Sequence, residues 1–441
     1  MIKTFAMRVF SSLLLLAVAS TLFSQNPISP MGVYIADPTG RVDKDGRLYV
    51  YGSLDKVPTT YCSTDYHVLS SSNLKDWTLY LNRFSSKGEN DEVSYSDGPL
   101  YAPDMMYRNG TYYLYYDTSD GSEGVATSVS PAGPFRSGTK IEGISGIDPN
   151  VFVDDDGQAY YFWGQFSAKG AKMNADMKTL DMGSIKDGIL TEQEHGFHEG
   201  GFVFKRNGWY YYVYTDVTRR DEACCIGYSM SRHPMGPYEY KGIIIDNTGC
   251  DPGNWNNHGS VVKFGNQWYV LYHRSTHNSN TMRKACIEPI HFLNDGTIPE
   301  VEMTTQGALN PLSAFDKLDA ARACLLHGNV RIEWTEDIHR EVLSKCHGGD
   351  RVVYKYLNFG NGTKKMTLRV KSESGGHIRA ILDHHFHGSF GVVDVPAGQD
   401  WTELTCELKE SVSGVHALWL CFDGKSEAGN LFQVDWIKFE N

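Results

Sequence analysis

Residues 207–214 read Asn-Gly-Trp-Tyr-Tyr-Tyr-Val-Tyr, a tight-turn signal followed by a strand of alternating aromatic side chains. The same phrase recurs at residues 45–51, 109–116 and 156–163, and in a variant form at 265–272. Asn-Gly and Asp-Gly supply the positive φ angles of a two-residue hairpin. The repeats are roughly 45 to 65 residues apart, which is the length of one propeller blade.

A second phrase follows the first: a short strand, a polar turn and then an aromatic residue, as in 66–77, 125–135 and 227–238. Each repeat therefore predicts an inner hairpin and an outer hairpin. Counting the repeats predicts an all-β fold, a five-bladed β-propeller over residues 25–308.

The pattern changes after Pro311. Short alternating stretches at 351–357, 366–370, 416–422 and 431–439 are typical of antiparallel strands. We predict a second domain over residues 309–441, a β-sandwich of the jelly-roll type.

Charge and composition exclude some classes of partner. The 441-residue chain has a net charge of −12 and no long basic run, so we expect no nucleic-acid partner. Aromatic residues make up 12% of the chain, which fits an all-β protein and also fits sugar binding.

The N-terminus has the form of a secretory signal. Lys3 and Arg8 precede an apolar run over residues 9–19, and small residues follow it. We predict that residues 1–24 are removed and that the protein is secreted or periplasmic. The alternative is a membrane anchor, but the apolar run is short for a span, and no other stretch looks membrane-spanning. The oligomeric state is left open.

Three acidic residues occupy equivalent positions, each a short way before one copy of the repeated aromatic strand. They are Asp37, Asp148 and Glu199. A rotary repeat would bring them to one end of a common axis. Two carboxylates facing a sugar, with a third to tune them, are what glycosidic-bond hydrolysis requires. The alternative for any one of them is a turn cap, because Asp before Pro commonly starts a turn.

The motifs around these acids resemble those of glycoside hydrolase family 43, a group of inverting enzymes on a five-bladed propeller. The matching pieces lie at residues 36–38, 101–104, 147–149, 198–200, 257–260 and 272–274. The C-terminal region is similar to carbohydrate-binding module family 6 at residues 349–354, 401–404 and 434–437. In this C-terminal region, the loop that would carry a sugar-stacking aromatic residue is short around residues 346–348. We therefore expect the C-terminal domain to have a mainly structural role.

The resemblance implies that Asp37 is the general base and Glu199 the general acid. A neighbouring carboxylate favours the protonated form of an acid by like-charge repulsion. Asp148 is expected to be that neighbour and to orient Glu199.

Other candidate substrate-binding residues come from the same motifs. Arg274 could hold a sugar hydroxyl or form a strand-edge salt bridge, and Asp104 could bind hydroxyls or brace a blade. Most aromatic residues are expected in the core, but Trp163, Phe166 and Trp255 lie where a ring could stack on a sugar.

Two positions suggest a metal. His258 is expected to point into the axial channel, where the resemblance implies a calcium ion or a water cluster. Asp435 matches a calcium ligand of the similar module, with pairing to a Lys or Arg as the alternative. Calcium prefers oxygen ligands, and no other cofactor is expected.

These observations predict an exported, exo-acting, inverting glycosidase acting on plant-type oligosaccharides or polysaccharides. An α-L-arabinofuranosidase is the leading interpretation, with a β-D-xylosidase of the same family as the alternative. A non-catalytic carbohydrate-binding propeller is the rival from another class, and retention of all three acids argues against it.

Overall fold

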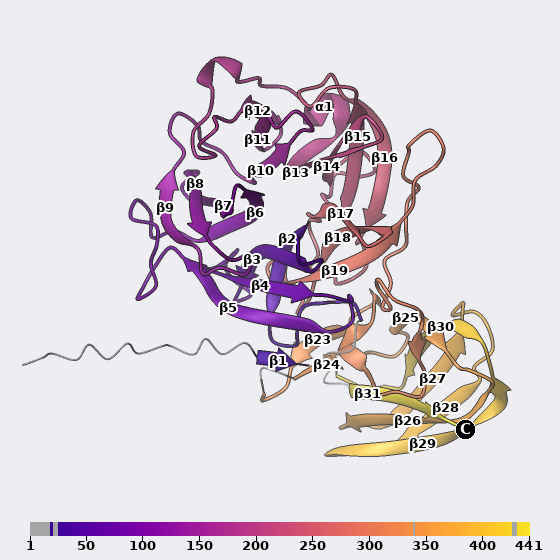
Figure 1. The fold of residues 1–441 in the computed structure, drawn as a ribbon. Helices are drawn as coiled ribbons and strands as arrows, with labels where there is room; N and C mark the ends of the chain where they lie inside the picture. The colour runs from indigo at the N-terminus through magenta and orange to yellow at the C-terminus, as the bar shows by residue number, and fades with distance from the viewer. Residues whose placement is uncertain (1–17, 21–24, 338–339, 426–429) are drawn as a thin grey trace, which may run out of the picture.

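Five antiparallel sheets surround a common axis, and a two-sheet sandwich lies against one side of the ring (Figure 1). The computed structural model describes residues 18–20, 25–337, 340–425 and 430–441. Apart from strand β1, Val18–Ser20, the predicted leader lies outside the described residues. Within the described part of the chain, no helix is long and apolar enough to cross a membrane.

Each blade runs outward from the axis in chain order, as the repeated hairpins predict. The innermost strands contact one another in the cyclic order β2, β6, β10, β13, β17 and back to β2. The first blade comprises β2 (Tyr34–Val42), β3 (Leu48–Asp55), β4 (Asp65–Ser71) and β5 (Trp77–Ser85), with β1 paired to β5 at its outer edge, and the second comprises β6 (Leu100–Arg108), β7 (Thr111–Thr118), β8 (Glu123–Ser128) and β9 (Arg136–Lys140). The third blade comprises β10 (Asn150–Val153), β11 (Ala159–Trp163) and β12 (Lys169–Lys172), and the fourth comprises β13 (Phe197–Arg206), β14 (Trp209–Asp216), β15 (Cys225–Ser231) and β16 (Glu239–Asp246). The fifth blade comprises β17 (Ser260–Phe264), β18 (Gln267–Ser275) and β19 (Arg283–Ile290). The predicted five-bladed propeller is confirmed.

The turn signals form the hairpins that the sequence predicts. Asn207 and Gly208 both have positive φ, 51° and 74°, and connect Arg206 of β13 directly to Trp209 of β14. Two consecutive positive φ angles suit the twist of a two-residue hairpin, and Asn and Gly adopt them at little cost.

The ring is closed by the segment that precedes the first blade. Asn26 Nδ2 donates to the Ile287 carbonyl at 3.1 Å, and the Ile287 N–H donates to Asn26 Oδ1 at 2.9 Å. The Ile28 N–H donates to the Ala285 carbonyl at 2.8 Å. The N-terminal segment therefore lies along β19, the outer strand of the three-stranded last blade, and joins the two ends of the ring.

Asp104 braces the inner strands and does not line the pocket, so the structure supports bracing, and not hydroxyl binding, of the two roles that the sequence predicts for it. Its carboxylate accepts two hydrogen bonds from Arg41 of β2, at 2.9 and 2.6 Å, and one from the Val151 N–H of β10 at 2.8 Å. Asp104 is 1% exposed, so this contact links three blades without facing substrate.

Two sheets form the C-terminal sandwich. Its strands are β20 (Leu312–Ser313), β22 (Leu325–His327), β25 (Arg351–Asn358), β27 (Gly376–Leu382), β28 (Gly391–Val395) and β30 (Val415–Asp423) in one sheet; and β21 (Leu318–Asp319), β23 (Arg331–Trp334), β24 (Glu341–Ser344), β26 (Thr363–Ser372), β29 (Gly398–Val412) and β31 (Gln433–Glu440) in the other. Helical structure in the described residues is limited to α1 (Glu192–His195) and two 3₁₀ turns, η1 (Met182–Ser184) and η2 (Ala320–Arg322).

The sandwich has its own apolar core, and it also shares a second core with the propeller. Val353, Ile381 and Trp419 of the sandwich pack in one buried cluster with Tyr228 and Val270 of the propeller. The two domains are therefore joined by apolar contact, which fits a structural role for the sandwich.

A buried ion pair crosses the same interface. Glu341 of β24 accepts hydrogen bonds from Lys284 of β19 and from the Tyr34 hydroxyl of β2. All three residues are at most 4% exposed. Breaking a buried pair from one side leaves an uncompensated charge.

We expect Glu341→Gln to destabilise the protein by about 3 kcal/mol, because Lys284 then lies buried without its counter-charge. Urea unfolding followed by tryptophan fluorescence measures this. Glu333→Gln on the adjacent strand β23 is the matched control, since Glu333 is only half-buried and forms no ion pair with any other described residue. Equal stability of the two variants would show that the interface pair contributes nothing.

Candidate active site

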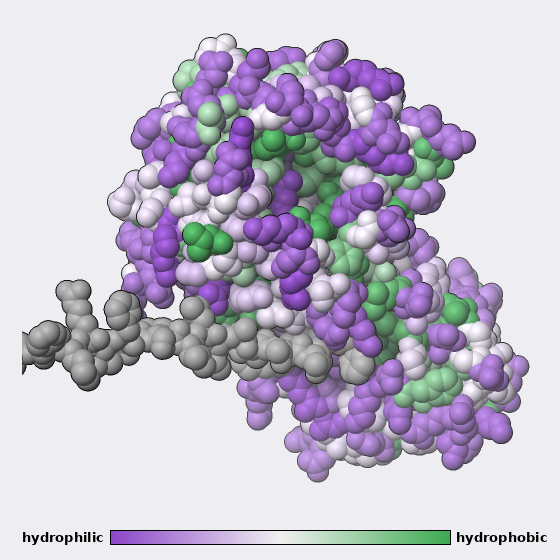
Figure 2. Space-filling view, viewed as in Figure 1, coloured by the Kyte–Doolittle hydropathy of each residue, from purple (hydrophilic) through white to green (hydrophobic). Residues whose placement is uncertain are grey.

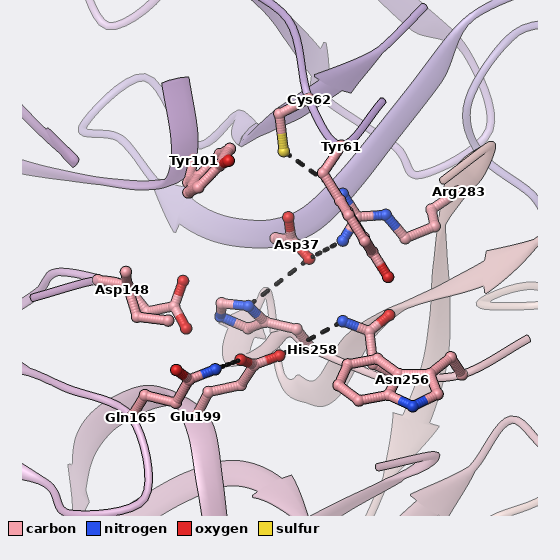
Figure 3. Close-up of a pocket in the computed structure, with 12 residues that line it drawn as sticks. Asp37, Tyr61, Cys62, Tyr101, Asp148, Gln165, Glu199, Asn256, His258 and Arg283 are labelled. Atoms are coloured by element: carbon pink, nitrogen blue, oxygen red, sulfur yellow. Dashed lines mark hydrogen bonds and ion pairs between the residues drawn. The ribbon is translucent and has the colours of Figure 1, made fainter. Parts of the chain in front are cut away.

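A pocket opens on the axis of the propeller, where the space-filling view shows a hollow near the centre of the ring (Figure 2). Its volume is about 310 Å³, and every blade contributes to its wall. The lining residues are Asp37, Tyr61, Cys62, Tyr101, Ile147, Asp148, Gln165, Glu199, Trp255, Asn256, His258 and Arg283. The three acids singled out in the sequence thus converge on one cavity (Figure 3).

Asp37 lies in a bulge at the pocket end of β2. The pairing of β2 with β3 shifts register between Ala36 and Thr39, and Asp37 has a φ of 51°. Positive φ is unfavourable for Asp and is retained where surrounding contacts determine the conformation. The bulge turns the Asp37 side chain toward the axis.

The Asp37 carboxylate is held by a cation and a hydroxyl. Arg283 Nη1 donates to Oδ1 at 2.9 Å, and Ser53 Oγ donates to Oδ2 at 2.6 Å. Asp55 binds the other side of the Arg283 guanidinium at 2.9 and 3.0 Å. Burial alone would raise the pKa of Asp37, but Arg283 together with His273 and His258 outweighs burial and holds that pKa well below its ordinary value.

Two histidines complete the surroundings of Asp37. His273 Nδ1 accepts a hydrogen bond from the Asp37 N–H at 3.2 Å, and its Nε2 faces the Asn256 carbonyl at 3.0 Å. His258 Nδ1 lies 3.6 Å from Asp37 Oδ1. Burial lowers the pKa of His258 despite the nearby Asp37, so His258 is neutral at neutral pH.

Glu199 is oriented by side-chain amides. It lies in β13 where the pairing with β14 shifts register on both sides of it. Gln165 Nε2 donates to one carboxylate oxygen at 2.8 Å, and Asn256 Nδ2 donates to the other at 3.4 Å. These contacts fix the direction of the carboxyl without placing a positive charge on it.

Asp148 fixes the backbone beside Glu199. Its Oδ2 accepts a hydrogen bond from the Gly200 N–H at 2.9 Å. Gly200 has a φ of 70°, and a Cβ there would lie 2.8 Å from the His258 ring. Burial, and after it the charges of Glu199 and Asp37, raise the pKa of Asp148 well above its ordinary value.

The two sides of the pocket therefore differ in charge. The Arg283 guanidinium forms an ion pair with Asp37. Among the described residues, no Lys or Arg forms an ion pair with Asp148 or Glu199. A cation favours the ionised form of one carboxyl, and neighbouring carboxyls favour the protonated form of another. The pocket can thus present a base and an acid at the same pH.

Arg274 does not reach the pocket, so its prediction as a substrate-binding residue is wrong. Successive side chains of a strand point to opposite faces. His273 faces Asp37, and Arg274 therefore points away, where it is 2% exposed and its Nε donates to Cys286 Sγ at 3.1 Å. The arginine that lines the pocket is Arg283, which lies on β19 opposite Ser275 of β18.

The three predicted stacking aromatics have different positions. Trp163 is 3% exposed in an apolar cluster, so it is a core residue and its predicted role is wrong. Trp255 lines the pocket and is 42% exposed. Phe166 lies on the rim, with its ring 5.0 Å from that of His198, which in turn lies 5.7 Å from the Trp255 ring.

The described residues do not form a calcium cage. No group of three or more His, Cys, Asp or Glu side chains in the described ranges is arranged to hold a metal ion. His258 offers one nitrogen, and Asp37 beside it is already engaged by Arg283 and Ser53. Calcium needs six to eight oxygen ligands.

Asp435 is likewise an ion-pair residue, which corrects its prediction as a calcium ligand. Arg340 Nε donates to Oδ1 at 3.0 Å, and Arg369 Nη1 donates to Oδ2 at 2.5 Å. Two guanidinium groups on one carboxylate leave no site for a cation. This is the pairing that the sequence left as the alternative.

Sequence reasoning missed Gln165, Asn256 and Arg283. Gln165 and Asn256 lie in loops just after β11 and before β17, next to motifs that the sequence did single out. Arg283 opens β19 and has no motif around it, so only the register of β18 with β19 could have placed it.

Comparison with known proteins agrees with this geometry. The model of the family described as glycosyl hydrolases family 43 matches residues 24–298, and that of carbohydrate binding module family 6 matches residues 328–441. A xylosidase/arabinosidase of Thermoclostridium stercorarium is 27% identical over 91% of this chain and 97% of its own. An arabinoxylan arabinofuranohydrolase of Paenibacillus polymyxa is 28% identical over 92% of this chain and 72% of its own.

Solved structures show the same arrangement. The family 43 arabinoxylan arabinofuranohydrolase of Bacillus subtilis, solved with cellotetraose, has a TM-score of 0.54 and 26% identity, covering 92% of this chain and 96% of that one. A family 43 β-xylosidase/α-arabinofuranosidase from a compost metagenome, solved with xylotriose in a calcium-free form, has a TM-score of 0.53 and 26% identity. The match covers 65% of this chain and 99% of that one.

Proposed function

Because the chain belongs to glycosyl hydrolase family 43 and is a glycoside hydrolase, we propose that it removes terminal α-L-arabinofuranosyl units with inversion at the anomeric carbon. The difference in charge between the two sides of the pocket carries the proposal. Arg283 stabilises an ionised Asp37, and Glu199 lies among uncharged amides and a second carboxyl. An inverting reaction requires this combination of a base and an acid.

In this mechanism Asp37 accepts a proton from a water molecule as that water attacks the anomeric carbon. Glu199 gives its proton to the glycosidic oxygen as the bond to the leaving sugar breaks. Asp37 is left protonated and Glu199 ionised, and proton exchange with solvent restores both. Gln165 and Asn256 keep the Glu199 carboxyl directed at the leaving oxygen.

His258 and Asp37 offer few free donor atoms to a calcium ion, so water would have to supply most of its oxygen ligands. In this proposal His258 is a neutral wall residue beside the base, and its place against Gly200 links the base side of the pocket to the backbone of Glu199.

The pocket size and the relatives support an exo-acting enzyme on arabinose-decorated chains. A cavity of about 310 Å³ lies at the small end of ligand pockets, which suits a terminal sugar. Trp255 on the rim offers a ring face for the sugar that follows it. A β-D-xylosidase remains the second candidate, because relatives named for both activities match over similar lengths. The leader that the sequence predicts over residues 1–24 supports export as part of this proposal.

Proton NMR of the first product tests the proposal. With an aryl α-L-arabinofuranoside we expect β-L-arabinose to appear first and then mutarotate, and with an aryl β-D-xyloside we expect slower release of α-D-xylose. First appearance of the retained anomer would exclude the inverting assignment. Faster release of xylose would favour the second candidate.

A further inference from the structure

A second pair of carboxyls lies behind the pocket, in the second blade. Asp117 near the end of β7 and Glu123 at the start of β8 are directly opposite each other in the strand ladder. Both residues are 0% exposed. Neither lines the pocket, so neither contacts substrate in the mechanism above.

The pair is connected to the acid side of the site. Asp117 Oδ1 accepts a hydrogen bond from the Asp148 N–H at 3.2 Å. Asp148 has a φ of 58°, so this contact holds a backbone conformation that Asp rarely adopts. Glu123 faces the same loop, because a Cβ built on Gly146 would lie 3.2 Å from Glu123 Oε1.

The pair lacks partners for two of its oxygens. The Tyr161 hydroxyl donates to Glu123 Oε2 at 2.7 Å, but Glu123 Oε1 and Asp117 Oδ2 are buried and have no hydrogen-bond partner in the described part of the chain. Among the described residues, no cation forms an ion pair with Asp117 or Glu123. Two adjacent buried carboxyls without a cation retain a proton, because both cannot ionise cheaply.

We propose that Asp117 and Glu123 are positioning residues: they hold Asp148 in place, and negative charge on the pair opposes loss of the proton on the acid side of the pocket. The inference rests on the proposed function, since it assigns a role to the pair in that reaction. Asp117 acts through its hydrogen bond to Asp148, and Glu123 acts through its charge when it ionises.

Acidic and phenolic side chains surround the pair, and within the described part of the chain no Lys or Arg forms an ion pair with it. These nearby side chains are Asp37, Asp148, Tyr66, Tyr95, Tyr101 and Tyr161. Burial raises the pKa of Glu123 to about 8, and burial followed by the charges of Glu123 and Asp148 raises the pKa of Asp117 well above its ordinary value. Ionisation of Glu123 therefore adds negative charge beside Asp148 as the pH passes 8, which opposes loss of the proton on the acid side.

The pH dependence of kcat/KM tests the charge of the pair. We expect Glu123→Gln and Asp117→Asn to move the alkaline limb of the profile to lower pH by about 0.5 to 1 unit, because the repulsion that retains the proton is lost. Glu142→Gln, on an exposed loop of the same blade, should leave the limb in place. An unmoved limb in both variants of the pair would overturn the proposal.

The hydrogen bond to Asp148 is tested separately. Asp117→Ala removes the acceptor, and we expect it to lower kcat at the optimum by about tenfold or more through misplacement of Asp148. Asp117→Asn retains an acceptor oxygen and should recover most of that loss. Equal kcat values for the Ala and Asn variants would show that Asp117 does not position Asp148.

Thermal unfolding gives a readout that needs no substrate. A carboxyl whose folded pKa is raised contributes stability that is fully present below its unfolded pKa and is lost as pH rises through the folded value. The Tm of the parent protein should therefore fall more steeply between pH 4.5 and 8 than that of Glu123→Gln. Parallel Tm curves would refute the buried proton, whereas an inactive parent protein with divergent curves would refute only the proposed reaction.

Discussion

Replacing Asp37 by Asn is expected to lower kcat/KM on every substrate by about a thousandfold or more, because it removes the carboxylate that Arg283 keeps ionised to accept the proton of the attacking water. The substitution preserves size and can still accept the hydrogen bond from Ser53. Release of chromophore from aryl α-L-arabinofuranosides and of arabinose from arabinoxylan oligosaccharides measures the loss.

The matched control for Asp37→Asn is Asp156→Asn, at the turn between β10 and β11 and therefore at the opposite end of that blade from Asp148. Asn serves equally well in such a turn, so the control should keep parental activity. Parental activity in Asp37→Asn itself would place the base elsewhere and remove the central element of the proposed reaction.

The repeated turn-and-strand phrase was enough to predict the propeller, because local signals agree there with the global fold. Asn-Gly at the hairpins and period-2 aromatics in the strands each specify the same structure. The three acids could be placed for the same reason, since each lies at or just before the start of an innermost strand and a rotary repeat brings those strand ends together.

Contacts between residues far apart in the chain could not be read from the sequence. Arg274 and Arg283 are both strand arginines, and the choice between them depends on which face of β18 points to the axis and on the register of β19. Asp104 and Asp435 both lie in sequence motifs, but the partners that bind them are distant in the chain. Arg41 is 63 residues from Asp104, and Arg369 is 66 residues from Asp435. A motif indicates that an acid is fixed in place, and only the fold shows whether sugar, metal or arginine lies opposite.

Glu199→Gln is expected to separate substrates by their leaving groups. A natural arabinosyl linkage has a poor leaving group that must be protonated, so we expect a loss of about a thousandfold in kcat/KM on arabinoxylan oligosaccharides. A dinitrophenyl arabinofuranoside leaves without a proton, and its loss should be tenfold or less. Glutamine retains hydrogen-bonding capacity toward Gln165 and Asn256, so the pocket geometry is preserved.

The pH profile gives a second readout of the same variant. On the activated substrate the alkaline limb should disappear in Glu199→Gln, because that limb reports loss of the acid's proton. Glu194→Gln, an exposed residue of α1 five positions earlier in the chain, is the matched control and should keep the parental profile. Equal losses of Glu199→Gln on both substrates would mean that Glu199 does not protonate the leaving oxygen, and the acid would then have to be sought in Asp148, whose raised pKa leaves it the other protonated carboxyl of the pocket.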